Sequence, residues 1–595
     1  TMDLEGRLLE PQLGGRAASW DEALDRVADR FSATIRQHGP ESVAFYVSGQ
    51  FLTEDYYVAN KLMKGFIGAA NIDTNSRLCM SSSVAGHKRA FGSDTVPGIY
   101  EDLEIADLVV LVGSNLAWCH PVLYQRIAAA KAERPQMKIV VIDPRRTMTA
   151  SIADLHLAIR PDGDAALFMG LLAHLARSPA ADHGYIAEHT LGFAGAVAAA
   201  SALSPADLRD QTGLTDTELG AFFQLFAAKG KTVTCYSQGV NQSASGTDKV
   251  NAIINCHLAT GRIGKPGTGP FSLTGQPNAM GGREVGGLAN MLAAHMPIES
   301  ETDRDRVRRF WGAPVIAANP GLKAVDMFGA VADGRIKALW IMATNPVVSM
   351  PHAGAVEAAI KACPFVVVSD MLATTDTARH AHVLLPSLGW GEKDGTVTNS
   401  ERRISRQRPF LPAPGEARAD WWQMAEVARR MGFGYAFDYG SPADIFAEHA
   451  ALSAFENAGS RDFDIGAQAG IGVNDYDALE PFQWPQPFGA AAQVTRFFSH
   501  GGFFHPDGKA HFVPVEAPGA SRQGGAFPFM LNTGRIRDHW HTMTRTGKSA
   551  RLSAHIAEPF AEIHPADAAG LDVRSADLVE VTSPHGSAVV RASLT

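Results

Sequence analysis

The sequence has few cysteines, and none of them is paired in the way that usually gives cysteine a structural role. Its 595 residues include five, far apart and never in a CxxC pair: Cys79, Cys119, Cys235, Cys256 and Cys363. An odd and scattered set argues against a disulfide framework and against a local zinc or iron–sulfur knot. It predicts a protein of a reducing compartment, and we expect a cytoplasmic one.

The sequence also lacks long apolar runs and a concentration of positive charge. Its richest apolar run, residues 108–112, stops at Gly113, well short of the roughly 18 residues of a membrane span. Charged residues make up only 19%, below the roughly 25% of an average soluble domain, so we expect much of the chain to be interior. The net charge is −9, with no basic cluster. We therefore expect neither a membrane nor a nucleic acid as partner.

Several short catalytic motifs are missing too. No GxGxxG follows a strand, and the run Gly547, Lys548, Ser549 lacks the glycine that a phosphate-binding loop needs five residues earlier, where Thr542 stands. GxSxG and HExxH are absent. These absences exclude the ordinary Rossmann, P-loop, serine hydrolase and zinc-peptidase assignments.

What the sequence does contain is an alternation of helix and strand patterns. Apolar residues at spacings of three and four predict a helix over residues 20–38. Helical patterns lie between most of the apolar strand candidates, as parallel βαβ units require. The pattern predicts an α/β fold. The strand candidates are residues 43–47, 108–112, 139–142, 233–236, 338–342, 365–368 and 383–385.

The predicted strands all end in small or polar residues. In open parallel sheets, ligands bind outside the carboxyl ends of the strands. Six polar ends together predict a large polar ligand, although any single end could be polar simply because loops are. The residues at these ends are Gln50, Asn115, Asp143 to Arg146, Gln238 to Gln242, Asn345, and Ser369 with Asp370.

Cys79 is the candidate reaction centre. It stands just before an expected helix that Ser81, Ser82 and Ser83 could cap. A thiol at a helix start lies at the positive end of the helix dipole, which favours its thiolate and makes it a better metal ligand or nucleophile. Spacing alone leaves the alternative of a buried core cysteine open.

Arg283 is the only cation in a segment crowded with glycine and proline, residues 269–287. Such a segment is expected to be a shaped loop rather than a regular helix or strand. A guanidinium there suits a small planar oxyanion, which it can hold through two parallel hydrogen bonds. The alternative is an arginine that braces its own loop by pairing with Glu284 or a carbonyl.

Four blocks of sequence, residues 75–121, 239–287, 391–403 and 533–549, resemble the molybdopterin oxidoreductase superfamily, and specifically its assimilatory nitrate reductases. The resemblance spans nearly the whole chain. It implies interleaved parallel-sheet α/β domains with a C-terminal β-barrel. The implied domains are residues 20–105 with 330–490, an inserted domain at 106–329, a linker at 491–526, and an incomplete barrel at 527–595.

The resemblance also implies a molybdenum ion held by two molybdopterin guanine dinucleotides, with Cys79 as the protein ligand of the metal. Soft sulfur donors suit molybdenum. By the same resemblance the dinucleotides are held by Gln50, Asn75, Cys79, Val112, Gly113, Ser114, Asn115, Cys119, Asp143, Pro144, Arg145, Arg146, Thr147, Asp162, Gly163, Asp164, Gln238, Gln242, Asn345, Ser369, Asp370, Lys393, Asp420, Thr533, Gly534, Arg535, His539, Trp540, His541 and Thr542. Asp164 or Asp420 suits the donor edge of guanine, and Lys393 and Arg535 suit pyrophosphate.

The chain departs from the family pattern at both ends: the cysteine cluster at the start of the family is missing, and the barrel at residues 527–595 is incomplete. The family begins with cysteines that bind a [4Fe-4S] cluster, and no such cysteines precede Cys79 here. We therefore expect an internal piece of a longer protein, in which the cluster is present although its ligands are absent from this chain.

The substrate assignment rests on Met80, Gln276 and Arg283. Formate dehydrogenases of the superfamily typically have histidine after the metal-binding cysteine, whereas this chain has Met80, as nitrate reductases do. The resemblance implies that Arg283 orients nitrate, Gln276 offers an amide and Met80 shapes the pocket. The implied reaction is oxygen-atom transfer from nitrate to give nitrite, for nitrate assimilation, with electrons from ferredoxin, flavodoxin or an NAD(P)H-linked reductase subunit.

Two other activities stay open at this stage. One is formate dehydrogenase, which uses the same scaffold for a different substrate and against which Met80 argues. The other is a non-catalytic subunit of an electron-transfer complex that has lost the metal. Retention of Cys79 and Arg283 argues against that alternative.

Overall fold

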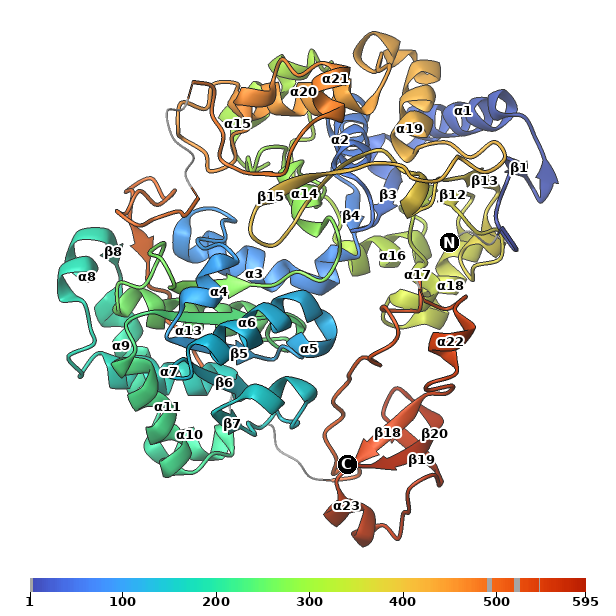
Figure 1. Cartoon of the computed structure of the whole chain (residues 1–595). Coiled ribbons are helices and arrows are strands. Elements are labelled where there is room, and N and C mark those ends of the chain that lie inside the picture. The colour runs from blue at the N-terminus through green and yellow to red at the C-terminus, as the bar shows by residue number, and fades with distance from the viewer. Residues whose placement is uncertain (1–3, 490–494, 518–524, 545) are drawn as a thin grey trace. The chain divides into compact units, whose positions relative to one another are not determined.

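The computed structural model describes residues 4–489, 495–517, 525–544 and 546–595 (Figure 1). It divides into two compact units, residues 1–518 and 519–595. Residues 491–494 and 518–524 of the predicted linker lie outside the described residues.

The first unit contains a seven-stranded sheet in the order β2-β1-β13-β12-β11-β3-β4. Strands β3, β4, β11, β12 and β13 run parallel, while the short strand β1 pairs antiparallel with β13 and with β2 at the edge. The sheet thus combines strands from an early and a late part of the chain. Their bounds are β1 Gln12–Leu13, β2 Arg16–Ala17, β3 Val43–Val47, β4 Ile72–Thr74, β11 Ala338–Met342, β12 Phe365–Asp370 and β13 Val383–Pro386.

Both faces of this sheet are covered by helices. Phe45 and Trp340 pack with Phe31 of α1 (Trp20–His38) on one face. Tyr46 packs on the other face with Phe328 of α16 (Ala324–Ala332), next to α18 (Ala353–Ala362). Because each strand is buried on both sides, it is a continuous apolar run instead of an alternating one.

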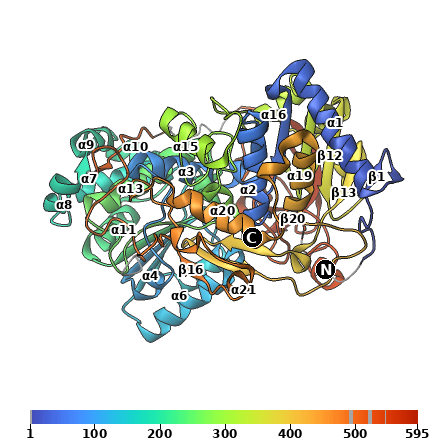
Figure 2. The same ribbon diagram turned by 90° about the horizontal axis from the view of Figure 1, so that it is seen from above.

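A second sheet lies entirely within residues 108–272, in the order β10-β9-β5-β6-β7, with all strands parallel. Helices α7 (Asp164–Leu175) and α13 (Gly246–Ala259) cover one face, and α6 (Pro121–Glu133) covers the other. Figure 2 shows the helices of this sheet at one end of the unit and α1, α16 and α19 at the other. The strands are β5 Leu108–Val112, β6 Lys138–Ile142, β7 Leu155–Leu157, β9 Thr232–Tyr236 and β10 Gly269–Ser272.

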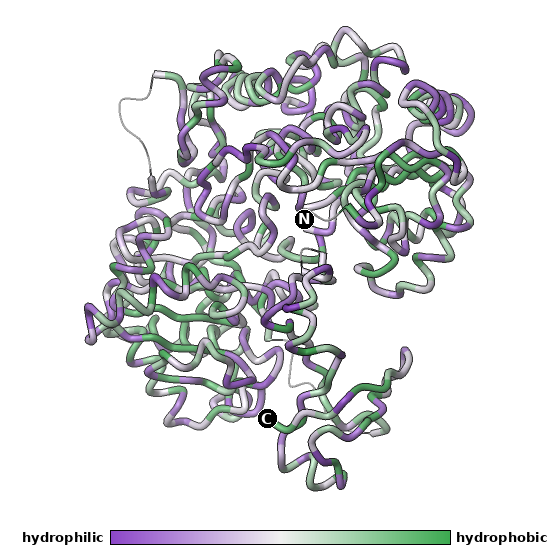
Figure 3. The backbone as a smooth tube through the Cα atoms, turned by 45° about the vertical axis from the view of Figure 1, so that its right-hand side comes forward, coloured by the Kyte–Doolittle hydropathy of each residue, from purple (hydrophilic) through white to green (hydrophobic). Residues whose placement is uncertain are grey.

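Hydrophobic residues dominate the strands of both sheets, which appear green in Figure 3. The smaller pairings are β14 Gly395–Thr398, β15 Arg403–Gln407 and β16 Phe482–Gln483 in one sheet, and β8 Thr190–Leu191 with β17 Ala510–His511. The other helices of the first unit are α2 Thr53–Lys61, α3 Ser76–Phe91, α4 Glu101–Ile105, α5 Leu116–Cys119, α8 His183–His189, α9 Phe193–Ser201, α10 Pro205–Thr212, α11 Asp216–Ala228, α12 Gln238–Asn241, α14 Ala279–Glu284, α15 Glu301–Trp311, α17 Pro346–Ser349, α19 Asp420–Ala428, α20 Pro442–Ala454 and α21 Val473–Asp477.

The second unit contains a three-stranded sheet in the order β18-β20-β19. The β-barrel expected for residues 527–595 stays a prediction. Strands β19 and β20 form an antiparallel pair. The bounds are α22 Ala550–Ser553, β18 Phe560–Ile563, α23 Pro565–Gly570, β19 Leu578–Ser583 and β20 Gly586–Leu594.

The predicted α/β fold with parallel sheets is confirmed, as are the helix at 20–38 and each predicted strand to within two residues. The expectation of no regular structure in residues 269–287 is wrong. This segment starts with β10, which pairs with β9, and contains the short helix α14. Two glycines fit inside α14 because a Cβ on Gly281 would meet Asn278 at 2.2 Å, and one on Gly282 would meet Tyr56 at 2.7 Å.

None of the helices formed by the described residues combines the length and the apolar character needed to cross a bilayer.

The close contact between Gly113 and Gly239 provides a test of packing. A Cβ on Gly239 would lie 2.6 Å from Gly113 Cα, which is backbone and cannot rotate away. We expect Gly239→Ala to lower the free energy of unfolding by about 1–3 kcal/mol. Gly220→Ala is the control, because it lies inside α11 with open space around it and should raise stability by up to about 1 kcal/mol. Denaturant unfolding of both variants measures the difference; equal effects would contradict the packing argument.

Candidate functional site

Cys79 lies in the first turn of α3, which follows β4 at the edge of the first sheet. The expectation that the helix starts after Cys79 is wrong, since α3 begins at Ser76, and Ser81 lies inside it. The hydroxyl of Ser81 donates to the Arg77 carbonyl, so it stabilises a helical turn instead of capping the helix. Asn75 does not cap the helix either, because its side chain accepts from the backbone of Gly49.

The Cys79 thiol is buried, and Gln238 Nε2 donates a hydrogen bond to its Sγ at 3.0 Å. Burial raises the pKa of the Cys79 thiol, while the Gln238 hydrogen bond and the positive charge of Arg283 lower it. In the protein without a metal, burial therefore outweighs the effect expected from the helix start, and the Cys79 pKa is raised. A bound cation would supply the missing stabilisation, because metal coordination deprotonates a thiol.

Gln276 joins the edges of the two sheets. It follows β10 of the second sheet, and its side chain accepts from Ser76 Oγ at 2.7 Å and donates to Asn75 Oδ1 at 3.1 Å. Ser76 and Asn75 follow β4 of the first sheet. The carboxyl ends of strands from both sheets therefore meet beside Cys79.

Arg283, on α14, is buried and pairs with Asp94. Its Nη1 lies 3.3 Å from Asp94 Oδ2, and its Nη2 contacts Met280 Sδ. Neither Glu284 nor a carbonyl, the two partners weighed from the sequence, is this partner. The sequence offered no signal for Asp94, because the pair joins residues 189 positions apart.

His87 is a second residue that sequence analysis missed. Its Nε2 lies 2.7 Å from the Tyr236 hydroxyl, and its Nδ1 lies 3.9 Å from Asp94 Oδ1. Burial lowers the pKa of His87 to about 4, although the charge of Asp94 acts in the opposite direction. His87 is therefore neutral near neutral pH. Met80, beside Cys79, is also buried and has no titratable group.

The carboxyl edge of the second sheet carries the predicted residues that follow β5, β6 and β9. Three buried hydroxyls at this edge, Ser114 Oγ, Thr147 Oγ1 and Thr274 Oγ1, have no hydrogen-bond partner among the described residues. Buried hydroxyls normally have a partner, so this edge is ready for a polar ligand. The predicted residues placed here are Val112, Gly113, Ser114, Asn115, Cys119, Asp143, Pro144, Arg145, Arg146, Thr147, Gln238 and Gln242.

The carboxyl edge of the first sheet carries Gln50, Asn75, Asn345, Ser369 and Asp370. Several of these side chains have partners within the protein. Asn345 Oδ1 accepts from Thr377 Oγ1 at 2.7 Å, and Ser369 Oγ donates to Gln423 at 2.8 Å. Burial raises the pKa of Asp370 to about 6.

Asp162, Gly163 and Asp164 lie at the start of α7, and Ser243 Oγ, in the segment that follows β9, donates to Asp162 Oδ1 at 2.8 Å. Lys249 Nζ lies 2.8 Å from Asp162 Oδ1 and 2.9 Å from Asp164 Oδ2. Asp162 also has a positive φ of 67°, which fixes an unusual turn before the helix. The carboxylate proposed for guanine, Asp164, thus already has a cationic partner.

Lys393 and Asp420 bind each other in a buried group with Asp55. Lys393 Nζ lies 2.5 Å from Asp420 Oδ2 and 3.3 Å from Asp55 Oδ2. Burial tends to lower the pKa of Lys393, but the two carboxylates raise it well above its ordinary value. The nucleotide-binding roles of Lys393 and Asp420 remain predictions, and this structure gives both residues a stabilising role.

The predicted residues Thr533, Gly534, Arg535, His539, Trp540, His541 and Thr542 lie in the second unit. Within it, Arg535 Nη2 donates to the His539 carbonyl at 2.9 Å. The Arg535 guanidinium also lies over the Trp540 ring, 5.5 Å from its centroid.

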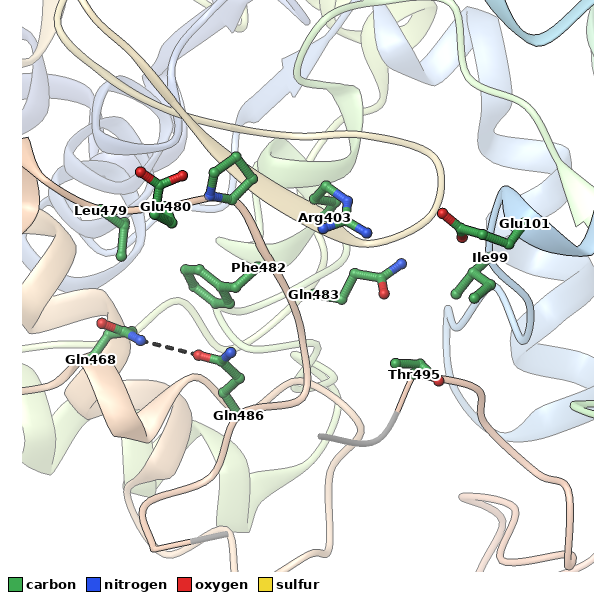
Figure 4. A pocket seen from close by; sticks show the side chains of 11 residues that line it. Ile99, Glu101, Arg403, Gln468, Leu479, Glu480, Phe482, Gln483, Gln486 and Thr495 are labelled. Carbon is green, nitrogen blue, oxygen red and sulfur yellow. Dashed lines mark hydrogen bonds between the residues drawn. The ribbon is translucent and has the colours of Figure 1, made fainter. Parts of the chain in front are cut away.

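A surface pocket of about 550 Å³ lies elsewhere in the first unit (Figure 4). Arg403, Glu101 and Glu480 line it, together with Gln468, whose amide donates to Gln486 at 3.0 Å. None of the residues that line this pocket belongs to the predicted site, and Cys79 lies outside it.

The model of the molybdopterin oxidoreductase family matches residues 14–430. The chain belongs to the molybdopterin oxidoreductase family. A second model, the Molydopterin dinucleotide binding domain, matches residues 529–595, in the second unit. The family assignment made from the four sequence blocks is thereby confirmed.

Relatives in the family include a nitrate reductase of Klebsiella oxytoca, 54% identical over 100% of this chain and 67% of its own length. A nitrate reductase of Shewanella frigidimarina is 52% identical over 95% of this chain and 61% of its own. The chain therefore spans about two thirds of the length of these relatives. Among solved structures, acetylene hydratase from Pelobacter acetylenicus has a TM-score of 0.75 at 19% identity, covering 99% of this chain and 83% of its own, which shows the fold alone.

Three more distant family members differ in their activities or roles. The periplasmic nitrate reductase of Desulfovibrio desulfuricans is 35% identical, over 97% of this chain and 78% of its own. The assimilatory nitrate reductase catalytic subunit of Bacillus subtilis is 33% identical, over 97% and 80%. The F420-dependent formate dehydrogenase 1 subunit alpha of Methanococcus maripaludis is 31% identical, over 97% and 82%.

The residues present fit a molybdopterin dinucleotide cofactor. Cys79 offers a soft sulfur ligand, and the unpartnered hydroxyls of Ser114, Thr147 and Thr274 offer polar contacts at the strand ends. Gly113 and Gly239 pack backbone against backbone at the same edge, since a Cβ on either would clash with the other. This edge and Cys79 are the parts of the first unit that would hold the cofactor.

The buried Lys393 group gives a test of its stabilising role. Lys393→Met leaves Asp55 and Asp420 buried without their cation, and we expect it to lower the free energy of unfolding by about 3–5 kcal/mol. Lys361→Met is the control, because Lys361 forms an exposed ion pair with Glu357, and stability should barely change. Denaturant unfolding compares the two variants. Equal stability of both would show that Lys393 is not part of a stabilising ion group.

Proposed function

We propose that this chain is the catalytic part of a molybdenum-dependent nitrate reductase that forms nitrite for nitrate assimilation. The observation that carries this proposal is that a buried guanidinium lies near the helix of a buried thiol. Arg283 pairs with Asp94, which lies 3.9 Å from His87 of α3, the helix of Cys79, and the charge of Arg283 acts on the Cys79 thiol. The nitrate reductases at 54% and 52% identity support the choice of substrate.

The chain's own residues have separate tasks in this proposal. Arg283 binds and orients nitrate, Gln276 holds the sheet edges together beside Cys79, and Met80 shapes the pocket without exchanging protons. The bound molybdenum cofactor supplies the two-electron chemistry. Overall, nitrate takes up two electrons and two protons and yields nitrite and water.

Formate oxidation is the second candidate, because a formate dehydrogenase subunit is 31% identical to the chain. That reaction removes a proton together with two electrons from carbon, so it benefits from a proton acceptor beside the metal. Met80 cannot accept a proton, and His87 pairs with the Tyr236 hydroxyl. A non-catalytic subunit is less well supported, since Cys79 and Arg283 are both present and share one site.

The setting of the reaction is part of the proposal. All five cysteines are free, which suits a reducing, cytoplasmic compartment. Relatives with assimilatory and periplasmic roles have similar identities, 33% and 35%, so identity alone does not separate these roles. We propose ferredoxin, flavodoxin or an NAD(P)H-linked reductase subunit as the electron donor, and a [4Fe-4S] cluster in the full-length protein.

The proposal predicts which substrate the enzyme uses. The full-length, molybdenum-loaded protein with a reduced artificial donor should form nitrite from nitrate, and should pass no electrons from formate to an oxidised acceptor. Cys79→Ala should abolish turnover because a metal ligand is lost, whereas Cys363→Ala, which alters a cysteine in a separate hydrophobic cluster, should keep it. Formate oxidation by the unmodified protein, with nitrate inert, would show that formate dehydrogenase is the right assignment.

Arg283 is predicted to act through its two-pronged geometry. Arg283→Lys keeps a positive charge but loses one charge-assisted hydrogen bond to nitrate. We expect kcat/KM to fall by about ten- to a hundred-fold, mainly through KM, because that bond contributes about 1.5–3 kcal/mol. Arg309→Lys, in a surface ion pair with Glu456, serves as the control. Steady-state kinetics with nitrate measures the effect, and an unchanged kcat/KM would mean that Arg283 only braces its loop.

A further inference from the structure

A buried histidine–aspartate pair lies close to the helix that carries Arg283. His295 Nδ1 lies 2.9 Å from both carboxylate oxygens of Asp462, and both side chains are buried. Neither residue is part of the site predicted from the sequence. Both are connected to the Arg283–Asp94 ion pair: Asp462 through the segment of Asp94, and His295 through the segment of Arg283.

The first connection runs from Asp462 to Asp94. Thr95 Oγ1 donates to Asp462 Oδ2 at 2.5 Å, and Thr95 directly follows Asp94. Asp94 is the ion-pair partner of Arg283, at 3.3 Å. Asp462 therefore anchors the segment that places a carboxylate beside the guanidinium.

The second connection runs from His295 to the end of α14. The backbone N–H of Ala294 donates to the Glu284 carbonyl at 2.7 Å, and Glu284 directly follows Arg283. Ala294 and His295 have φ values of 55° and 58°, a left-handed conformation that residues with a Cβ rarely adopt. Such backbone persists only where surrounding contacts hold it, and the bond from His295 to Asp462 is one such contact.

The charges around the pair favour a protonated His295. Burial tends to lower the pKa of His295, but the charge and hydrogen bond of Asp462, with smaller effects of Asp94 and Glu284, raise it above its ordinary value. The other charged or titratable groups that act on the pair, or that the pair acts on, are His449, Lys88, Arg402 and Arg461. The positive charges of His295 and Arg283 are thus each paired with a buried carboxylate, that of Asp462 and that of Asp94.

We propose that the His295–Asp462 pair positions Arg283 for nitrate, by holding Asp94 through Thr95 and the end of α14 through Ala294. This inference rests on the proposed nitrate reductase function. His295 and Asp462 are positioning residues, because they act through Asp94 and Arg283. They fix the position of the Arg283 guanidinium, the proposed nitrate-binding group, which the six-residue helix α14 would not fix by itself.

The direction of the His295 pKa shift determines how kcat/KM for nitrate should depend on pH. Because the pKa of His295 is raised in the folded protein, the charged pair is fully present at acid pH. It is lost as the pH rises through that raised value. The kcat/KM for nitrate should therefore decline on the alkaline side through an ionisation that belongs to His295.

The test uses His295→Asn and Asp462→Asn in the full-length, molybdenum-loaded enzyme. Asparagine keeps a hydrogen-bond donor and tolerates the left-handed conformation, but it removes the charge. We expect KM for nitrate to rise about ten-fold in each variant, with kcat within about three-fold of the unmodified enzyme. The dissociation constant of nitrate for the oxidised enzyme, measured by titration calorimetry without turnover, should rise by a similar factor.

Two comparisons separate positioning from a general loss of structure. In a background of Arg283→Lys, His295→Asn should cause little further loss, because it acts through Arg283. His449→Phe is the matched control: His449 stacks on Phe463, which also contacts the His295 ring, and its ring nitrogens have no partner among the described residues. His449→Phe should leave KM unchanged and should retain the alkaline decline that His295→Asn removes.

The outcomes distinguish the two proposals. If the unmodified enzyme reduces nitrate but His295→Asn and Asp462→Asn leave KM, the dissociation constant and the pH profile unchanged, only the positioning role is wrong. A full additional loss on top of Arg283→Lys, or an equal loss in His449→Phe, would also overturn it. If the unmodified enzyme neither binds nor reduces nitrate, the proposed function fails and this inference fails with it.

Discussion

The buried carboxylate of Asp73 is the interaction on which the arrangement of the site depends. It lies in β4, and its two oxygens accept four hydrogen bonds: two from Arg77, at 3.0 and 3.2 Å, one from the backbone of Ala289 and one from that of Ala324. Arg77 belongs to α3, the helix of Cys79, whereas Ala289 lies in the loop that follows α14 and Arg283. One carboxylate therefore fixes the helix of Cys79 and the loop that follows Arg283 relative to the same strand. A charged group can do this in an irregular loop because it satisfies backbone N–H groups that have no strand or helix partner.

The same loop is held from its other side by a buried cation. Lys64 Nζ donates to the carbonyls of Gly286, Leu288 and Met291, and burial lowers its pKa to about 7 despite the nearby charge of Asp73. Residues 286–291 thus present carbonyls to an ammonium and an amide to a carboxylate. This differs from the two sheets, whose strands are stabilised by apolar packing on both faces. The fold is set by hydrophobic layers, and the site between them is set by a polar interior in which charges and backbone groups compensate one another.

The strands could be predicted because a strand that is buried on both faces has a continuous run of apolar residues in the sequence. Residues 43–47, 108–112 and 338–342 are such runs, and they match β3, β5 and β11. The short strands β4 and β10 have no such run, and they are strands only because a neighbour pairs with them. Sequence motifs predicted Cys79 and Arg283 as site residues, but they did not predict which side chains contact them. The Ser76–Gln276 and Asp94–Arg283 contacts join residues 200 and 189 positions apart, and no local pattern encodes such a choice. The start of α3 was misplaced for the same reason, because Asn75 bonds to the distant Gln276 and to Gly49.

Arg283 is only loosely paired with Asp94, which leaves hydrogen-bond donors of its guanidinium for a ligand. Its Nη1 lies 3.3 and 3.4 Å from the two oxygens of Asp94, and its Nε has no hydrogen-bond partner among the described residues. The charge of the guanidinium is thus partly balanced while donor capacity remains. A small anion bound there would add a second negative charge close to Asp94, and repulsion between like charges would oppose its binding. Glu284, whose pKa burial already raises to about 7, lies next along the chain. Its side chain accepts hydrogen bonds from Thr398 Oγ1, at 2.7 Å, and from Trp484 Nε1, at 2.6 Å, and so has partners of its own. The remaining donors of Arg283 must therefore outweigh that repulsion if the proposed nitrate site is to bind its substrate.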